Sequence, residues 1–151
     1  MPVDIIGIDH VFIDVNDLAK AEAFYDKVMP ILGFRKGKAS NKVSPRLRYD
    51  CRLFTYWVRL VPSATEGAEP GRASVPHLCF RVVDEATVDR ACRELQGAGI
   101  QASEPKYHTQ YSDEYYATFF SDPDGALLEV MNFGERRRKR MLEWDSGEKK
   151  I

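Results

Sequence analysis

The chain has 151 residues, of which 44% are hydrophobic, 30% charged and 11% aromatic. This length suits one compact domain, and the content of large apolar residues excludes a mainly disordered chain. The 22 basic and 23 acidic residues nearly balance, with an acidic excess in residues 1–133, which argues against nucleic acid as the main partner. No apolar run approaches the roughly 20 residues that a membrane-spanning helix needs.

The N-terminal segment and the cysteines both favour a cytoplasmic location. Residues 1–7 contain no basic stretch followed by a hydrophobic one, so an export signal is not expected. Cys51, Cys79 and Cys92 are odd in number and lack CxxC spacing. Reduced thiols are therefore expected in place of disulfides or zinc ligands.

The sequence contains one pattern twice. The segments 10–17 and 77–84 each begin with His, continue with β-forming residues and reach an Asp after seven positions. After each Asp, apolar residues recur at steps of three and four, which is typical of an amphipathic helix. Asp17 and Asp84 are therefore predicted to be helix N-caps. The first helix is expected to end at Gly33 and the second within 97–99.

Three strand-like segments follow each predicted helix: 34–37, 46–51 and 53–61 in the first half, and 100–103, 115–121 and 126–133 in the second. Asp-Pro-Asp-Gly at 122–125 predicts a turn. The sequence thus predicts an α+β fold of two βαβββ repeats, at about 5–61 and 75–133, joined by a linker at 62–74. Residues 134–151 carry seven basic and four acidic residues and are predicted to form a basic C-terminal helix or tail.

Four segments resemble the vicinal-oxygen-chelate superfamily, which includes glyoxalase I, extradiol dioxygenases, methylmalonyl-CoA epimerase, fosfomycin-resistance enzymes and bleomycin-binding proteins. They are GIDHV at 7–11, PILGF at 30–34, PHLCF at 76–80 and FFSDPDGALLEV at 119–130. The resemblance covers roughly residues 5–133. It implies that the repeats form a cupped, partly open barrel of mixed sheets within one domain at 1–133.

The resemblance also implies a homodimer, because family members of this length are commonly dimers in which the first half of one chain faces the second half of the other. The shared site would then take His10 from one subunit and His77 and Glu129 from its partner. Four aromatic residues of the first half would be partly covered by the partner: Phe12, Phe54, Tyr56 and Trp57.

The resemblance brings His10, His77 and Glu129 together as ligands of a divalent metal ion. Two imidazoles and one carboxylate suit Mn, Fe(II), Co, Ni or Zn, and a substrate with two neighbouring oxygens would chelate the ion. A single strand His is more often a hydrogen-bonded structural residue, and a single strand Glu is more often solvated. All three at the family's positions favour the metal site.

Individual activities of the family fit less well than the family itself. Glyoxalase I adds a Glu from the last strand of the first half, but 53–61 contains no acid, and the nearest are Asp50 and Glu66. Weak or absent glyoxalase I activity is therefore expected. Dioxygenases and fosfomycin enzymes place a Tyr where Phe119 stands, and the latter also place a Thr where Phe12 stands, so both activities are disfavoured.

Further site residues are predicted from their chemistry. His108 and Tyr116 are predicted to be catalytic, because a His can serve as general base and a Tyr can donate a hydrogen bond to a substrate oxygen. The alternative is a polar loop whose aromatic residues pack on the barrel rim. Tyr56, Arg59 and Phe119 are predicted to contact the substrate.

Basic residues have two possible interpretations. Arg46, Arg48 and Arg52 share one strand face, which either binds a carboxylate or phosphate of the substrate or is a solvated outer surface. The basic run at 136–140 is interpreted as a solvated helix face or an interface rim.

The sequence therefore predicts a metal-dependent, glyoxalase-like enzyme acting on a small molecule with two neighbouring oxygens. Isomerase, epimerase or lyase chemistry by proton abstraction beside a metal-bound carbonyl is expected. The alternative is a metal-free binding protein of the bleomycin-resistance type, which would sequester a flat ligand. A structural or regulatory subunit has no positive signal beyond the basic tail. Neither nucleic acid nor a membrane is an expected partner.

Overall fold

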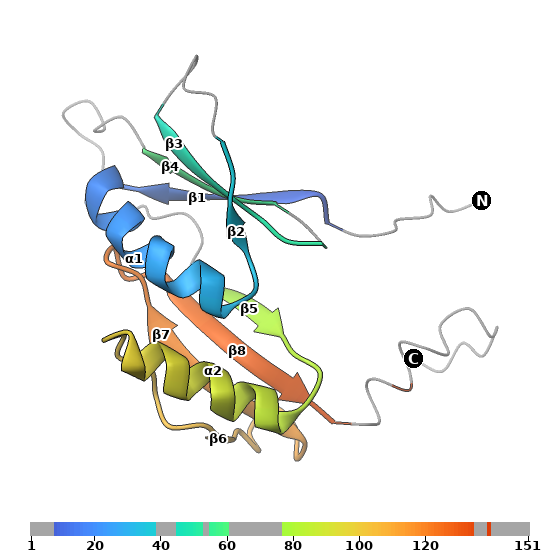
Figure 1. The fold of residues 1–151 in the computed structure, drawn as a ribbon. Helices are drawn as coiled ribbons and strands as arrows, with labels where there is room; N and C mark the ends of the chain where they lie inside the picture. Colours follow the sequence, from blue (N-terminus) through green and yellow to red (C-terminus); the bar gives the residue numbers. More distant parts are fainter. Residues whose placement is uncertain (1–7, 39–44, 53–54, 61–76, 135–138, 140–151) are drawn as a thin grey trace, which may run out of the picture. The chain divides into compact units, whose positions relative to one another are not determined.

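The computed structural model describes residues 8–38, 45–52, 55–60, 77–134 and 139 (Figure 1). The chain divides into two compact units, one made of Met1–Leu78 with Ser121–Leu127 and the other of Cys79–Phe120 with Leu128–Ile151. Neither α1 (Leu18–Ile31) nor α2 (Glu85–Gly97), the two helices of the described part, has the length and apolar character needed to cross a membrane.

The first sheet has the strand order β1-β4-β3-β2. Its strands are β1 (His10–Val15), β2 (Arg35–Lys36), β3 (Arg46–Asp50) and β4 (Thr55–Leu60). Strand β1 runs parallel to β4, while β3 is antiparallel to both β4 and β2. Along the chain, β1 and α1 therefore come first, and the later strand β4 lies beside β1.

The second sheet repeats this order as β5-β8-β7-β6. Its strands are β5 (His77–Arg81), β6 (Lys106–Tyr107), β7 (Tyr115–Ser121) and β8 (Leu127–Phe133). Helix α2 follows β5 as α1 follows β1. The α+β class and the two βαβββ repeats predicted from the sequence are confirmed.

Both predicted N-caps are confirmed. Asp17 accepts a hydrogen bond from the Lys20 backbone N–H at 3.0 Å, and Asp84 accepts one from Thr87 at 2.8 Å. Each carboxylate thus satisfies a backbone donor that has no partner within its helix. Beyond the last turns, Gly33 and Gly99 adopt φ angles of 82° and 81°, a left-handed conformation that favours glycine and ends the helix.

One face of the first sheet is buried under α1. Alternate strand residues point to opposite faces, and the buried set includes Ile13, Val15, Leu47, Tyr49, Tyr56 and Val58. Helix α1 contributes four buried residues to the same unit: Ala21, Tyr25, Val28 and Met29. The other face of this sheet carries the half-exposed residues, and the candidate functional residues of this unit lie on it.

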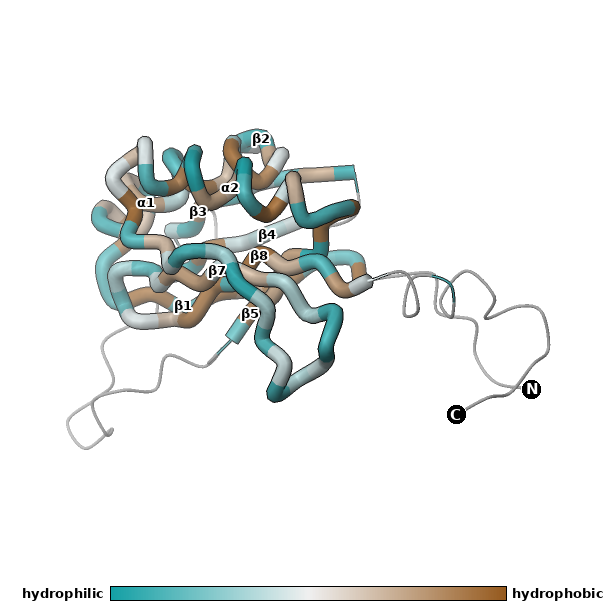
Figure 2. Tube along the Cα trace, turned by 90° about the horizontal axis from the view of Figure 1, so that it is seen from below, coloured by the Kyte–Doolittle hydropathy of each residue, from teal (hydrophilic) through white to brown (hydrophobic). Residues whose placement is uncertain are grey.

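The second sheet is organised in the same way. Along α2, hydrophobic and hydrophilic residues alternate with helical spacing (Figure 2), and the apolar ones, Val88, Ala91, Cys92 and Leu95, are buried. Tyr116 reaches α2 by donating a hydrogen bond to Asp89 at 2.8 Å. The even-numbered residues of β7 therefore face α2, and the odd-numbered residues face away from it.

One predicted strand is wrong. Residues 100–103 do not form a strand, and the two-residue strand β6 lies at 106–107 instead. Ser103 makes isolated bonds to β7. Its N–H donates to the Phe119 carbonyl at 2.8 Å, its hydroxyl oxygen accepts from the Phe119 N–H at 3.0 Å, and its carbonyl accepts from the Thr118 hydroxyl at 2.6 Å. Pro105, which follows two residues later, cannot donate to a ladder.

The predicted turn at 122–125 is confirmed. The Asp122 carboxylate accepts hydrogen bonds from the backbone N–H groups of Asp124 and Ala126 at 3.0 and 2.8 Å, and Gly125 has a φ of 85°. The predicted linker at 62–74 lies outside the described residues. Of the predicted tail at 134–151, only Gly134 and Lys139 are described.

Candidate functional site

The face of the first sheet opposite α1 combines aromatic rings with arginines. The Phe12 and Trp57 rings stack with centroids 6.0 Å apart. The Arg46 and Arg48 guanidinium carbons lie 5.1 and 5.5 Å from the Trp57 centroid, and that of Arg59 lies 5.0 Å from Phe12. These five residues are called the arginine–aromatic face below. Arg52 lies beyond the end of β3.

Such a face suits a flat ligand that carries oxygen. Aromatic faces attract cations and planar groups, while a guanidinium presents a planar fork of donors to carboxylate or phosphate. Arg59 is anchored by Asp14, its Nε lying 2.7 Å from a carboxylate oxygen, and this hydrogen bond raises the pKa of Arg59. The predicted substrate contact of Arg59 is thus placed on a defined surface.

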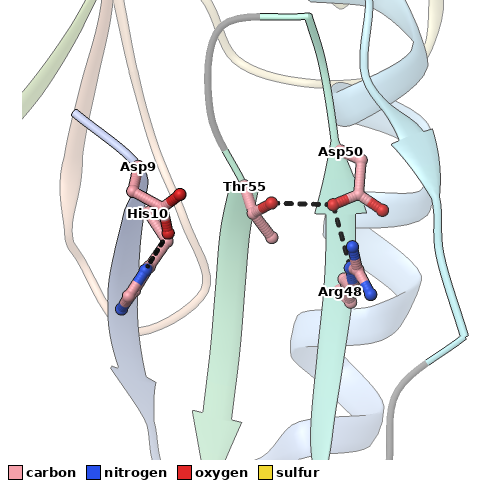
Figure 3. A network of polar contacts seen from close by, with 5 residues as sticks. All are labelled: Asp9, His10, Arg48, Asp50 and Thr55. Carbon is pink, nitrogen blue, oxygen red and sulfur yellow. Dashed lines mark hydrogen bonds and ion pairs between the residues drawn. The ribbon is translucent and has the colours of Figure 1, made fainter. Parts of the chain in front are cut away.

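His10 lies at the edge of this face. Its ring meets Phe12 edge-on with centroids 5.2 Å apart, and its side chain is about half exposed. Figure 3 shows the Nδ1 atom directed at the Asp9 carboxylate, at a distance of 2.6 Å. In the neutral ring this contact places the proton on Nδ1, which leaves the Nε2 lone pair available to a metal ion.

The strand position beside His10 is occupied by Thr55. The register pairs His10 with Thr55 on β4, and Thr55 in turn with Asp50 on β3. The Thr55 hydroxyl donates to Asp50 at 2.8 Å, and Asp50 also binds the Arg48 Nε at 2.9 Å (Figure 3). Asp50, one of the two acids nearest to the segment 53–61 in the sequence, is therefore one strand further from His10 and is engaged by an arginine.

Glu129 is the buried carboxylate of the second unit. It lies in β8 and is 1% exposed. Its carboxylate hydrogen-bonds to Tyr115, whose pKa is raised by burial and by its bonds to Glu129 and Cys79. The Glu129 Oε1 atom accepts no hydrogen bond from the described residues. A buried carboxylate requires compensation by donors or by a cation.

His108 lies next to the same tyrosine. Its ring packs edge-on against Phe119, with centroids 5.0 Å apart, and against Tyr115, at 6.4 Å. Because Tyr115 and Phe119 belong to the odd-numbered set of β7, His108 lies on the sheet face turned away from α2. The structure therefore brings together His108, Phe119, Tyr115 and, through Tyr115, Glu129.

Two predicted site residues point elsewhere. Tyr116 faces α2, and its bond to Asp89 raises its pKa to about 12. Tyr56 is fully buried on the α1 face, where its hydroxyl donates to Tyr25 at 3.2 Å. Neither residue lies on the face that holds the other predicted groups, since a step of one strand residue reverses the side-chain direction.

His77 is the first residue of β5 and is exposed. Strand β5 is the hydrogen-bonded neighbour of β8, which carries Glu129. Within the part of the chain that the structure describes, no three His, Cys, Asp or Glu side chains gather closely enough to hold a metal ion. None of the three cysteines takes part in a disulfide bond.

Tyr115 and Asp9 are two contributors that the sequence reasoning did not identify. The sequence could have indicated Tyr115, because it lies four strand residues before Phe119 and therefore on the same face, whereas Tyr116 lies on the opposite face. Asp9 precedes the first His in the motif at 7–11. Its contact with the imidazole could not be predicted from the sequence, since that contact depends on the side-chain conformation.

Comparison with known proteins agrees with this fold. A family model described as the glyoxalase/bleomycin resistance protein/dioxygenase superfamily matches residues 7–130. None of the curated proteins searched matches the chain significantly.

Solved structures also share the fold. A lactoylglutathione lyase from Agrobacterium tumefaciens has a TM-score of 0.64 at 19% identity, with 85% of this chain and 95% of that chain covered. A glyoxalase/bleomycin resistance protein from Albidiferax ferrireducens has a TM-score of 0.61 at 24% identity, covering 83% and 98%. A virulence protein from Salmonella typhimurium reaches 0.59 at 23%, covering 89% and 100%.

Proposed function

Since the chain belongs to the glyoxalase/bleomycin resistance protein/dioxygenase superfamily, we propose that it is a metal-dependent enzyme acting on a small molecule with two neighbouring oxygens. The observation that carries the proposal is the buried Glu129 carboxylate, which is held by Tyr115 on the face that also presents His108. A carboxylate at this depth is costly to keep charged unless a cation or several donors compensate it.

The proposed ligands are His10, His77 and Glu129. His10 fits this role because its contact with Asp9 occupies Nδ1 and leaves Nε2 available. His77 fits because it is exposed and begins the strand next to that of Glu129. Nitrogen and carboxylate oxygen donors suit Mn, Fe(II), Co, Ni or Zn. We propose that the three ligands meet in a homodimer.

The proposed chemistry is isomerisation, epimerisation or lyase chemistry by movement of a proton beside a carbonyl group. When bound, the divalent ion would supply Lewis-acid polarisation of the substrate oxygens. His108 is proposed to contact the substrate as a catalytic residue, Phe119 to line the substrate beside it, and Arg59 to bind an anionic part of the substrate. A cytoplasmic location is proposed as well, because the three cysteines form no disulfide bond in the structure.

Activity of the lactoylglutathione lyase type is not favoured for this chain. That name belongs to a structural neighbour of 19% identity, which supports the fold alone. The resemblance implies a Glu on the last strand of the first half, but β4 carries no acid and has Thr55 at the position beside His10. The proposed ligands therefore include one carboxylate, that of Glu129, and lack the second carboxylate of glyoxalase I.

The second candidate is a metal-free binding protein, and the arginine–aromatic face supports it. Stacked Phe12 and Trp57 with guanidinium groups over their rings suit a flat, oxygen-bearing ligand. The two proposals differ in one property, because only the enzyme needs a metal ion at Glu129.

Metal titration separates them. Metal-free protein titrated with Co²⁺, Ni²⁺, Mn²⁺ and Zn²⁺ should bind at least one of them at one site per chain. His77→Ala and Glu129→Gln should each remove most of the binding, because each deletes one of three protein ligands. Glu94→Gln, on the half-exposed side of α2, is the matched control and should bind like the wild type. Wild-type protein without affinity for any of these ions would favour the binding protein.

A further inference from the structure

His108 sits in a turn that holds its ring in place. Its backbone N–H donates to the Tyr115 carbonyl at 2.7 Å, and its own carbonyl accepts from Tyr111 at 2.9 Å. The segment between β6 and β7 therefore closes on itself and is tied to the start of β7. The turn therefore holds the imidazole in a fixed position. A group that binds a ligand in a defined orientation requires such a position.

Three aromatic rings enclose the imidazole. Phe119 and Tyr115 meet it edge-on, and Tyr111 stacks on it with centroids 6.2 Å apart. As a result only 9% of His108 is exposed. Tyr111 itself is 66% exposed, so its ring is the part of the enclosure that can move aside with the least loss of packing.

The two ring nitrogens have different surroundings. The Gln110 side-chain nitrogen lies 3.3 Å from His108 Nδ1. An amide nitrogen carries hydrogens and accepts none, so Nδ1 must be the acceptor. In the neutral ring the proton is then on Nε2. This Nε2 atom is buried and has no hydrogen-bond partner among the described residues.

A buried donor without an acceptor is costly in a folded protein, and such groups are rare unless a ligand or water satisfies them. We propose that the Nε2–H group of His108 is a hydrogen-bond donor to a carbonyl, enol or carboxylate oxygen of the bound small molecule, with Gln110 fixing the tautomer. The inference rests on the proposed function for the presence of such a ligand. It changes the role expected from the sequence, in which His108 accepts a proton.

The tautomer can be measured in metal-free protein by ¹⁵N NMR of the histidine ring at about pH 9, where an ordinary imidazole is neutral. The Nε2–H form is expected for His108 in the wild type. Gln110→Glu should shift the population toward Nδ1–H, because a carboxylate accepts from Nδ1. A wild-type ring protonated on Nδ1 would overturn the proposal, whether or not the protein binds metal.

The donor role is tested with oxalate, which carries acceptor oxygens on neighbouring carbons, added to Co²⁺-loaded protein. His108→Leu should weaken oxalate binding about tenfold, as expected for one lost hydrogen bond to a charged group. His108→Gln places an amide N–H near the former Nε2 and should retain most of the affinity. Equal affinity in the wild type and His108→Leu, or no oxalate binding by loaded wild type, would refute the donor role. Where Co²⁺ does not bind, the same test uses whichever of Ni²⁺, Mn²⁺ and Zn²⁺ does, and failure of the wild type to bind any of the four ions would instead refute the proposed function.

Discussion

At the scale of single residues, the proposed metal site depends on how the buried Glu129 carboxylate is held. Glu129 is almost completely covered, and its carboxylate bonds to the Tyr115 hydroxyl. A hydrogen bond from outside the metal shell fixes the orientation of a ligand and thereby raises its affinity for the ion. Tyr115 is therefore expected to act through Glu129 as a positioning residue.

Tyr115→Phe should lower metal affinity by about 10- to 100-fold, the usual range for the loss of such a bond. The aromatic ring remains, so packing against His108 is kept. Isothermal titration with Co²⁺ measures the affinity, and the visible spectrum of bound Co²⁺ reports whether the ligand geometry has changed. Tyr107→Phe is the matched control, because that hydroxyl bonds to Glu85; an equal loss in both variants would contradict the assignment.

Glyoxalase activity provides a second test at this scale. Thr55 stands beside His10 on β4, and Asp50, an acid next to this strand in the sequence, is engaged by Arg48. Among the described residues, β4 therefore offers no carboxylate to exchange the substrate proton. Metal-loaded protein should turn over the methylglyoxal–glutathione adduct far below the usual enzyme range of about 1–1000 per second. A rate within that range, followed spectrophotometrically, would disprove the prediction and direct attention to His108 as the base.

At the scale of secondary-structure elements, helix α2 depends on its acidic cap. Hydrogen bonds from the Thr87 side chain and backbone lower the pKa of Asp84. A carboxylate whose pKa is lower in the folded state stabilises the protein fully at pH values above its pKa in the unfolded chain. That stabilisation is lost as the pH falls through its pKa in the folded protein. Asp84→Asn removes the titration and keeps a capping side chain.

The melting temperature of the wild type should therefore exceed that of Asp84→Asn at about pH 6, and the difference should shrink toward zero by about pH 2. Calorimetry across this range measures it. Asp113→Asn, an exposed substitution in the segment before β7, is the control and should show a much smaller pH-dependent difference. A difference that grew on acidification would contradict the sign.

Helix α1 is joined to the turn at 122–125 by one buried hydrogen bond. The Tyr25 hydroxyl donates to Asp122 at 2.8 Å, and burial is the main cause of the raised pKa of Tyr25. Tyr25→Phe should lower the free energy of unfolding by about 1–3 kcal/mol, because the carboxylate loses a buried donor. Urea denaturation measures the change. Tyr111→Phe, on an exposed ring, should stay within about 0.5 kcal/mol of the wild type.

The elements were largely predictable because their signals are local. The N-caps Asp17 and Asp84, the glycine stops and the Asp-Pro-Asp-Gly turn each act over a few residues, and all are confirmed. The strand expected at 100–103 was wrong because its apolar residues pack without a continuous ladder. Short strands depend on their partners, which a single sequence does not reveal.

The candidate site was less predictable because its composition depends on which face of a strand each side chain occupies. Tyr116 and Phe119 lie three residues apart, as do Tyr56 and Arg59, so neither pair can share one face of a regular strand. The structure keeps Phe119 and Arg59 on the faces away from the helices and turns Tyr116 and Tyr56 toward them. Alternation applied to these pairs would have selected Tyr115 in place of Tyr116.

At the scale of the whole molecule, the duplicated fold raises the question of which chain supplies each ligand. His10 belongs to the first unit and Glu129 to the second. The homodimer expected from the family would combine His10 of one subunit with His77 and Glu129 of the other. Of the aromatic residues expected at its interface, Tyr56 is buried within its own unit, Phe54 is not described, and Phe12 and Trp57 stack on the half-exposed face.

Mixed dimers test this arrangement. His10→Ala and Glu129→Ala should each bind little metal alone. After subunit exchange, about half of the dimers contain one chain of each kind, and each of these regains one intact site, so about a quarter of the sites should recover. Native mass spectrometry can verify the exchange and count bound metal ions. No recovery despite complete exchange would show that the ligands come from one chain.

A second mixture makes the result specific. His77→Ala and Glu129→Ala remove ligands that the shared-site arrangement takes from the same subunit. In their mixed dimer, one site lacks His77 and the other lacks Glu129, so neither is intact and no metal should be regained. Recovery in the first mixture and none in the second is the pattern that only a site shared across the two-fold axis produces, because a site within one chain recovers in neither.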